Sequence, residues 1–265
     1  MKNKITLTNL REMKKAGDKI ACLTAYDASF AALLDEAGID VLLVGDSLGM
    51  VLQGEDNTLK VTVADMLYHT RLVSRAGKRP LIVSDMPFMS YATPAQALGN
   101  AARLMSDGGA EVIKIEGGEN VLEVVQHLNR HDIPVCGHLG LQPQSVHKYG
   151  GYRVQGRQRQ AAEQISQDAQ RLQDAGVIML VLECIPADLA AKISSALDIP
   201  TIGIGAGLDC DGQVLVLYDM LGISARIPSM ARNFLEGKAS VQDAVRSYVE
   251  AVKAASFPAP EHSFK

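Results

Sequence analysis

The stretch Glu111–Gly118, EVIKIEGG, combines a buried-strand pattern with two charges at the point where the strand should end. Its valine and two isoleucines form the short, β-branched apolar run that is typical of a buried parallel strand. Lys114 and Glu116 interrupt that run just before two glycines. Burying an ionised side chain is costly unless a partner or a metal ion compensates it, so we expect these charges to point into a site.

The same pattern recurs at four other places in the chain. Each of these apolar runs ends in a polar side chain, and such runs alternate with segments of helical periodicity. Because the carboxyl ends of parallel strands form one common rim, we expect the polar groups to converge although they lie far apart in sequence. The four runs are VLLVGDS with Asp46, PLIVSDM with Asp85, PVCGHLG with His138, and IMLVLECIP with Glu183.

The order of these segments predicts a single-domain (β/α)8 TIM barrel over residues 1–265. Seven strand-then-helix units are clear, and Leu221–Ile223 is expected to supply the eighth strand. A length of 265 residues is close to the ~250 that are typical of this fold. No GxGxxG motif follows the first strand, which disfavours an open dinucleotide-binding sheet. The chain after about residue 256 is expected to be a loose tail.

Composition limits the partners and the location that we expect. The net charge of −4 leaves no basic surface for nucleic acid or an anionic membrane. The start of the chain has no apolar signal region, and no run approaches ~18 apolar residues. We therefore expect a cytoplasmic protein that acts on small molecules. Its four cysteines show no metal-finger spacing, and we expect Cys22 and Cys136 to be small core residues.

Two long connections and one glycine cluster stand out along the chain. The connections at 45–61 and 139–160 exceed the ~12 residues that are usual for a loop, so both are candidates for segments that cover the rim. The glycines of GIGAG, at 203–207, allow either an anion to approach the backbone or simply a tight turn after a strand.

Three carboxylates at different strand ends predict a site for a hard cation. Asp46, Asp85 and Glu116 supply oxygen ligands, whereas a zinc site is expected to bring more histidine or cysteine. Mg²⁺ fits best, followed by Mn²⁺ or Co²⁺, because such ions keep some waters and accept substrate oxygens. For each acid taken singly, a helix N-cap or a loop salt bridge is the structural alternative.

A cation held in this way suits a substrate that chelates it through two oxygens, such as a 2-oxo acid. The metal then stabilises the enolate that forms when a proton leaves the neighbouring carbon. Glu183 is the best candidate for the base, since its apolar neighbours would remove it from water. His138 is either a base, a hydrogen-bond partner of the substrate, or a structural histidine. We expect Lys114 to neutralise the substrate carboxylate and Ser47 to hold it, with Asp46 and His138 as further substrate contacts.

Several motifs together resemble the ketopantoate hydroxymethyltransferase family, over about Leu7 to Gly237. The segment 225–237 is a looser match, and the tail after Phe257 matches no part of the family that we identify. The motifs are LTAYD (23–27), LVGDSLGMV (43–51), VSDMPFMSY (83–91), IKIEGG (113–118), GHLGLQPQ (137–144), VLECIP (181–186), GIGAG (203–207) and DGQVLVLYDMLG (211–222).

This resemblance implies a Mg²⁺-dependent TIM barrel of pantothenate biosynthesis. It implies transfer of a one-carbon unit from 5,10-methylenetetrahydrofolate to 3-methyl-2-oxobutanoate, which gives 2-dehydropantoate. It also implies metal ligands at Asp46 and Asp85, with Glu116 in or near the coordination shell. It further implies substrate contacts at Ser47, Asp85 and Lys114, and a proton acceptor at Glu183. The family forms homo-oligomers, commonly decamers.

Two other functions compete with this interpretation. A Mg²⁺-dependent C–C lyase of the phosphoenolpyruvate mutase or isocitrate lyase type also stabilises the enolate of a 2-oxo acid. Such a lyase is expected to carry its cysteine in a Cys-Gly-His context on a mobile loop, whereas Cys136-Gly137-His138 lies on a predicted strand. The second competitor is a ligand-binding barrel without catalysis, which leaves the four rim carboxylates unexplained.

Overall fold

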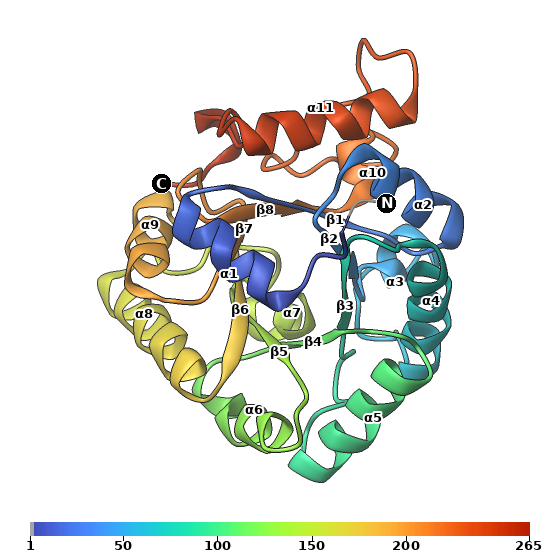
Figure 1. Ribbon diagram of the computed structural model, residues 1–265. Coiled ribbons are helices and arrows are strands. Elements are labelled where there is room, and N and C mark those ends of the chain that lie inside the picture. Colours follow the sequence, from blue (N-terminus) through green and yellow to red (C-terminus); the bar gives the residue numbers. More distant parts are fainter. Residues whose placement is uncertain (1–2) are drawn as a thin grey trace.

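Eight parallel strands close into a barrel in the computed structural model, which describes residues 3–265 (Figure 1). The strands follow one another in sequence order, and the last pairs with the first. The predicted (β/α)8 TIM barrel is thereby confirmed. The strands are β1 Ile20–Thr24, β2 Val41–Val44, β3 Leu81–Asp85, β4 Val112–Glu116, β5 Val135–Gly140, β6 Val177–Glu183, β7 Thr201–Ile204 and β8 Gly212–Leu215.

Helices surround the barrel and lie mostly where the sequence pattern predicts them. At the start of α4 (Val63–Ala76), Thr62 and Asp65 form a capping box. At the start of α5 (Pro94–Ser106), Thr93 accepts from the Gln96 amide, while the Gln96 side chain accepts from the Ala92 amide. The longer helices are α1 Leu7–Ala16, α2 Ala28–Ala37, α4 Val63–Ala76, α5 Pro94–Ser106, α6 Leu122–Asn129, α8 Arg159–Asp174, α9 Ala187–Ala196 and α11 Val241–Lys253.

Short helices lie in the connections between these elements. The connection at 45–61 contains α3, and the connection at 139–160 contains η2 and α7, so both long rim segments have structure of their own. The short helices are α3 Leu48–Val51, α7 Val146–Tyr149 and α10 Leu217–Met220, with 3₁₀ turns η1 Glu119–Val121, η2 Pro143–Ser145 and η3 Pro260–His262. No helix within residues 3–265 is both long and apolar enough to cross a membrane.

Helix α1, which the sequence pattern did not reveal, crosses the amino end of the barrel (Figure 1). Its Leu10 is buried, and its Lys14 ammonium bonds Asp211 Oδ2 at 2.6 Å and the Ser194 carbonyl at 2.9 Å. Both partners lie on the amino side of the last two strands. The helix therefore covers the end of the barrel opposite to the rim.

The eighth strand is Gly212–Leu215, so the prediction of Leu221–Ile223 was wrong. Leu221 instead ends α10, and Gly222 follows it with a left-handed φ of 69°. Pairing with β1 selects Gly212, because a Cβ there would lie 2.5 Å from the Ile20 carbonyl oxygen. A strand with glycine and glutamine in its first two positions gives little apolar signal, which explains the error.

The C-terminal residues pack against the barrel, in contrast to the loose tail that was expected. Phe257 is 2% exposed and lies against Phe234 and Tyr248. Phe264 forms a parallel bridge with Pro186, and its carbonyl accepts from the Ala187 amide at 3.0 Å. Burial of an aromatic ring and these backbone contacts at the start of α9 hold the segment in place.

Candidate active site

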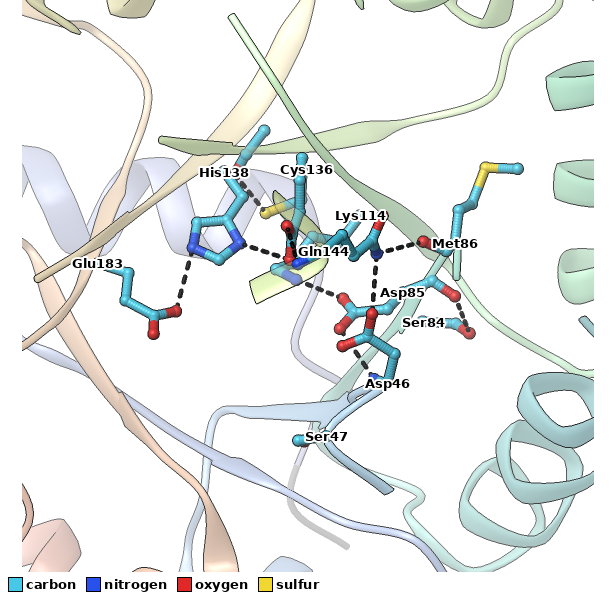
Figure 2. A network of polar contacts seen from close by, with 12 residues as sticks. Asp46, Ser47, Ser84, Asp85, Met86, Lys114, Cys136, His138, Gln144 and Glu183 are labelled. Atoms are coloured by element: carbon cyan, nitrogen blue, oxygen red, sulfur yellow. Dashed lines mark hydrogen bonds and ion pairs between the residues drawn. The ribbon is translucent and has the colours of Figure 1, made fainter. Parts of the chain in front are cut away.

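Asp46, Asp85 and Lys114 form one half of a buried polar site at the rim (Figure 2). Asp85 ends β3 and Lys114 lies on the adjacent β4, so the parallel register places the two side by side. The Lys114 ammonium lies 2.6 Å from Asp85 Oδ1, and the Asp46 amide donates to Asp85 Oδ2 at 3.1 Å. All three residues are at most 4% exposed, so their charges act on one another with little screening.

The site holds more negative than positive charge. Burial raises the pKa of Asp46 well above its ordinary value, and the neighbouring Asp85 and Glu116 carboxylates raise it further. Burial opposes the charge of Lys114, but Asp85, Glu116 and Asp46 together raise its pKa above the ordinary value. Beneath Lys114 lies a cavity of only about 10 Å³ with mainly apolar walls. A cation that balances the excess negative charge must therefore approach from the rim side.

Glu116, His138 and Glu183 form the other half of the site. His138 on β5 lies between the two acids, with Nδ1 3.4 Å from Glu116 Oε1 and Nε2 3.1 Å from Glu183 Oε2. Neither contact has the alignment of a hydrogen bond, although both distances are those of ion pairs. Burial and Lys114 oppose protonation of His138, but the two carboxylates outweigh them and raise its pKa to about 9.

Burial also affects the pKa of Glu116, the acid next to Nδ1 of His138. It favours the neutral carboxyl group, but His138, Lys114 and the Gln144 amide outweigh it, so the pKa of Glu116 is lowered. Glu116 is therefore a carboxylate that the site keeps ionised.

Glu183 is the last residue of β6, and its side chain is 13% exposed, more than those of Asp85, Lys114, Glu116 and His138. Figure 2 shows it on the far side of His138 from Asp46 and Asp85. The next residue, Cys184, has a left-handed φ of 48°, which is strained for a residue with a side chain. The backbone thus makes a sharp turn immediately after Glu183, the predicted base.

Ser47 lies directly after Asp46, at the edge of the half of the site that contains Asp46, Asp85 and Lys114. Its hydroxyl is 2.9 Å from the Tyr26 hydroxyl, which in turn is buried after β1. A Cβ at Gly45 would lie 2.7 Å from Ser47 Oγ, so glycine is needed there for the serine side chain to fit. Of the predicted site residues, the structure thus brings Asp46, Ser47, Asp85 and Lys114 together on one side and Glu116, His138 and Glu183 on the other.

The donor set suits a hard cation, although it is not a complete cage. Within residues 3–265, no three side chains drawn from His, Cys, Asp and Glu are arranged to hold a metal ion by themselves. Mg²⁺ is usually held by one or two carboxylates plus waters and substrate oxygens, so Asp46 and Asp85 are sufficient as protein ligands. The excess of buried carboxylate fits a cation in this space, and Glu116 Oε1 makes no hydrogen bond although it lies 3.4 Å from His138 Nδ1.

Two residues of the site were missed from the sequence. Gln144, in the segment after β5, is 6% exposed and bonds both Asp46 and Glu116. Tyr91, in the connection after β3, donates its hydroxyl to Gln144 Oε1 at 2.6 Å. Both lie in segments without periodicity. The signals that contained them were the motifs VSDMPFMSY (83–91) for Tyr91 and GHLGLQPQ (137–144) for Gln144.

Cys136 lies on β5 with its side chain buried under the site, where a reactive loop cysteine would not lie. Burial raises its pKa to about 12, and burial likewise raises the pKa of Cys210 to about 11. A thiol with a raised pKa stays protonated until the pH approaches that value, and the thiolate is the reactive form. Nothing in this arrangement favours a cysteine-dependent lyase.

We expect that none of the four cysteines reacts appreciably with 5,5′-dithiobis(2-nitrobenzoic acid) in the native protein at pH 8. All four are free and buried, so the reagent finds neither access nor thiolate. Absorbance at 412 nm measures the reaction, and unfolding in guanidinium chloride should release four equivalents. One rapidly reacting thiol in the native protein would contradict the buried placement.

The barrel and its rim site define this protein as a TIM-barrel enzyme whose buried carboxylates and lysine lie at the carboxyl ends of the strands. The chain belongs to the ketopantoate hydroxymethyltransferase family, whose sequence profile matches residues 4–260.

Full-length relatives agree with this assignment, and solved structures share the fold. The chain is 61% identical to the 3-methyl-2-oxobutanoate hydroxymethyltransferase of Nitrosococcus oceani, covering 98% of this chain and 99% of that one. It is 58% identical to the enzyme of the same name from Methylococcus capsulatus, covering 100% and 98%. Phosphonopyruvate hydrolase (TM-score 0.63, 11% identity, 82% and 83% covered) and 2,3-dimethylmalate lyase (0.57, 17%, 94% and 97%) share the fold.

Proposed function

We propose that this protein is a 3-methyl-2-oxobutanoate hydroxymethyltransferase. It would transfer a one-carbon unit from 5,10-methylenetetrahydrofolate to 3-methyl-2-oxobutanoate and produce 2-dehydropantoate for pantothenate biosynthesis. The observation that carries the proposal is the full-length similarity to proteins of this name, at 58–61% identity. The two halves of the site support it, because they separate groups that bind a 2-oxo acid from a group that removes its proton.

The half of the site that contains Asp46, Asp85 and Lys114 would bind the carboxylate and ketone of the substrate. Asp46 and Asp85 would hold Mg²⁺, with Glu116 beside it, and Mg²⁺ would supply a Lewis acid for the charge that develops on the ketone oxygen. Lys114, which already neutralises Asp85, would face the substrate carboxylate. Ser47 would offer its hydroxyl to the same group, in the orientation that Tyr26 holds.

Glu183 would accept the proton from C3 of the substrate. His138 contacts Glu183 Oε2, whereas Oε1 makes no hydrogen bond within residues 3–265 and is available for the proton. With a pKa of about 9, His138 is largely protonated at pH 7 and holds both neighbouring carboxylates in place. The short distance from His138 to each acid thus positions the base relative to the bound substrate.

Hydrogen–deuterium exchange at C3 of 3-methyl-2-oxobutanoate tests this proposal. The reaction is followed by NMR in D₂O with enzyme and Mg²⁺, with and without EDTA, and first without folate. Exchange that needs both enzyme and metal would support proton removal at this site, and formation of 2-dehydropantoate after addition of the folate would complete the test. Absence of exchange both without and with folate would reject the proposal.

Asp85→Ala is expected to weaken both Mg²⁺ binding and substrate binding, by about tenfold or more. The change removes one of two proposed ligands and the partner of Lys114. Isothermal titration with Mg²⁺ and the KM for the 2-oxo acid measure the two effects. Unchanged Mg²⁺ affinity together with full activity would remove Asp85 from the set of ligands.

Some expectations from the sequence remain proposals of the same kind. The folate donor, Mg²⁺ as the metal, a homo-oligomer such as a decamer, small-molecule substrates as the only partners, and a cytoplasmic location all belong to this proposed function. Sedimentation velocity would measure the assembly state directly.

A further inference from the structure

Gln144 is a buried amide in a rim segment where a polar side chain would ordinarily face water. It lies in η2, between β5 and α7, and is 6% exposed. A buried amide costs free energy unless its donors and acceptor are satisfied. The partners of Gln144 therefore show what holds it in this position.

Every polar group of the Gln144 side chain has a hydrogen-bond partner in the segments that follow β2 and β3. Nε2 donates to Asp46 Oδ2 at 2.8 Å and to the Met86 carbonyl at 2.9 Å, while Oε1 accepts from the Tyr91 hydroxyl at 2.6 Å. Its backbone amide also donates to Glu116 Oε2 at 3.1 Å. One residue thus joins the ends of β2, β3 and β4 (Figure 2).

These contacts orient two carboxylates by one oxygen each. Gln144 occupies Oδ2 of Asp46 and Oε2 of Glu116, whereas Asp46 Oδ1 makes no hydrogen bond within residues 3–265 and Glu116 Oε1 is buried without one. Tyr91 supports this orientation of the amide: its hydroxyl lies 2.6 Å from Gln144 Oε1 and 3.2 Å from the Glu116 carbonyl, and donation to Oε1 leaves the NH₂ end facing Asp46. Partners that orient metal-binding groups typically change metal affinity 10- to 100-fold when they are removed.

We propose that Gln144 is a positioning residue that aims Asp46 and Glu116 at the cation and ties cation binding to the order of the segment 141–158. This inference rests on the proposed function, because it requires a divalent cation at the site. The coupling is reciprocal: a cation that fixes Asp46 and Glu116 also fixes the segment that carries Gln144.

Mn²⁺ binding to the wild-type protein and to variants, without substrate, tests the inference. Gln144→Met, which keeps the volume but none of the hydrogen bonds, should weaken Mn²⁺ binding by about tenfold or more. Tyr91→Phe removes a single hydroxyl and should weaken it in the same direction by less. Gln142→Met is the matched control, since within residues 3–265 the side-chain amide of Gln142 hydrogen-bonds only the His138 carbonyl and the Tyr149 hydroxyl, at 3.5 and 3.3 Å. This variant should bind Mn²⁺ as the wild type does.

Hydrogen exchange of peptides from 141–158 gives a second readout. If Gln144 only stabilised the fold, its replacement would not change the effect of Mn²⁺ on the exchange rate of these peptides. Addition of Mn²⁺ should slow exchange in the wild type and in Gln142→Met, and have little effect in Gln144→Met. Wild-type Mn²⁺ affinity and wild-type protection in both Gln144→Met and Tyr91→Phe would overturn this inference while leaving the proposed function intact. A wild-type protein that binds no divalent cation, with or without 3-methyl-2-oxobutanoate, would instead overturn the metal site and this inference together.

Discussion

Glu183→Gln is expected to slow exchange of the C3 proton of 3-methyl-2-oxobutanoate by about 10²- to 10⁴-fold, the usual contribution of a general base. The amide keeps the size of the side chain but cannot accept the proton. Mg²⁺ affinity should stay within about twofold of the wild type, because Glu183 lies beyond His138 from Asp46 and Asp85 (Figure 2). NMR in D₂O and isothermal titration measure the two quantities.

Glu163→Gln is a suitable control for this variant. Glu163 is exposed on α8, and its only ion pair among the described residues 3–265 is with Arg159, so the same chemical change there should leave exchange unaffected. Exchange at the wild-type rate in Glu183→Gln would assign the base to another group, and His138 would be the first to test.

Lys114→Met is expected to lower the free energy of unfolding by about 3–5 kcal/mol, the range for a buried ion pair that loses one partner. The change leaves Asp85 without its cation at a site that also contains the buried Asp46 and Glu116. Urea unfolding in EDTA at a fixed protein concentration measures the loss. Fixed concentration matters because assembly would add to the apparent stability.

A double variant distinguishes charge from packing in this result. In Asp85→Asn/Lys114→Met the unpaired carboxylate is gone, so part of the lost stability should return. Lys15→Met, at an exposed position on α1, controls for the loss of a lysine. A Lys114→Met protein as stable as the Lys15→Met protein would show that the ion pair contributes little.

The sequence predicts the strands that carry chemistry because their signal is local. β2, β3, β4 and β6 each have an apolar run with β-branched residues and an acid at or just after its end, and the parallel register then fixes which charges meet, as with Asp85 and Lys114. β8 lacks such a run, since Gly212 and Gln213 begin it, and only its pairing with β1 defines it. Pairing across the whole chain is not visible in a local window of sequence.

The site was predictable to the extent that its residues lie on strands. Asp46, Lys114 and Glu116 follow from strand ends, but Gln144 and Tyr91 take their roles from contacts to residues far away in the chain. The direction in which His138 points was also hidden, because alternation along β5 does not show that it lies between Glu116 and Glu183. Long-range side-chain geometry is what the structure adds.

Helix α1 has a consequence for the order in which reactants come and go. Helix α1 covers the amino end of the barrel, and side chains fill its interior. Substrates and products must therefore enter and leave through the rim at the carboxyl ends of the strands. Asp46, Asp85 and Lys114 are at most 4% exposed, so whatever binds to them sits deepest. A second, larger reactant would then bind nearer the rim and block access to them. The kinetics should therefore be ordered, with the small acid binding first and its product leaving last.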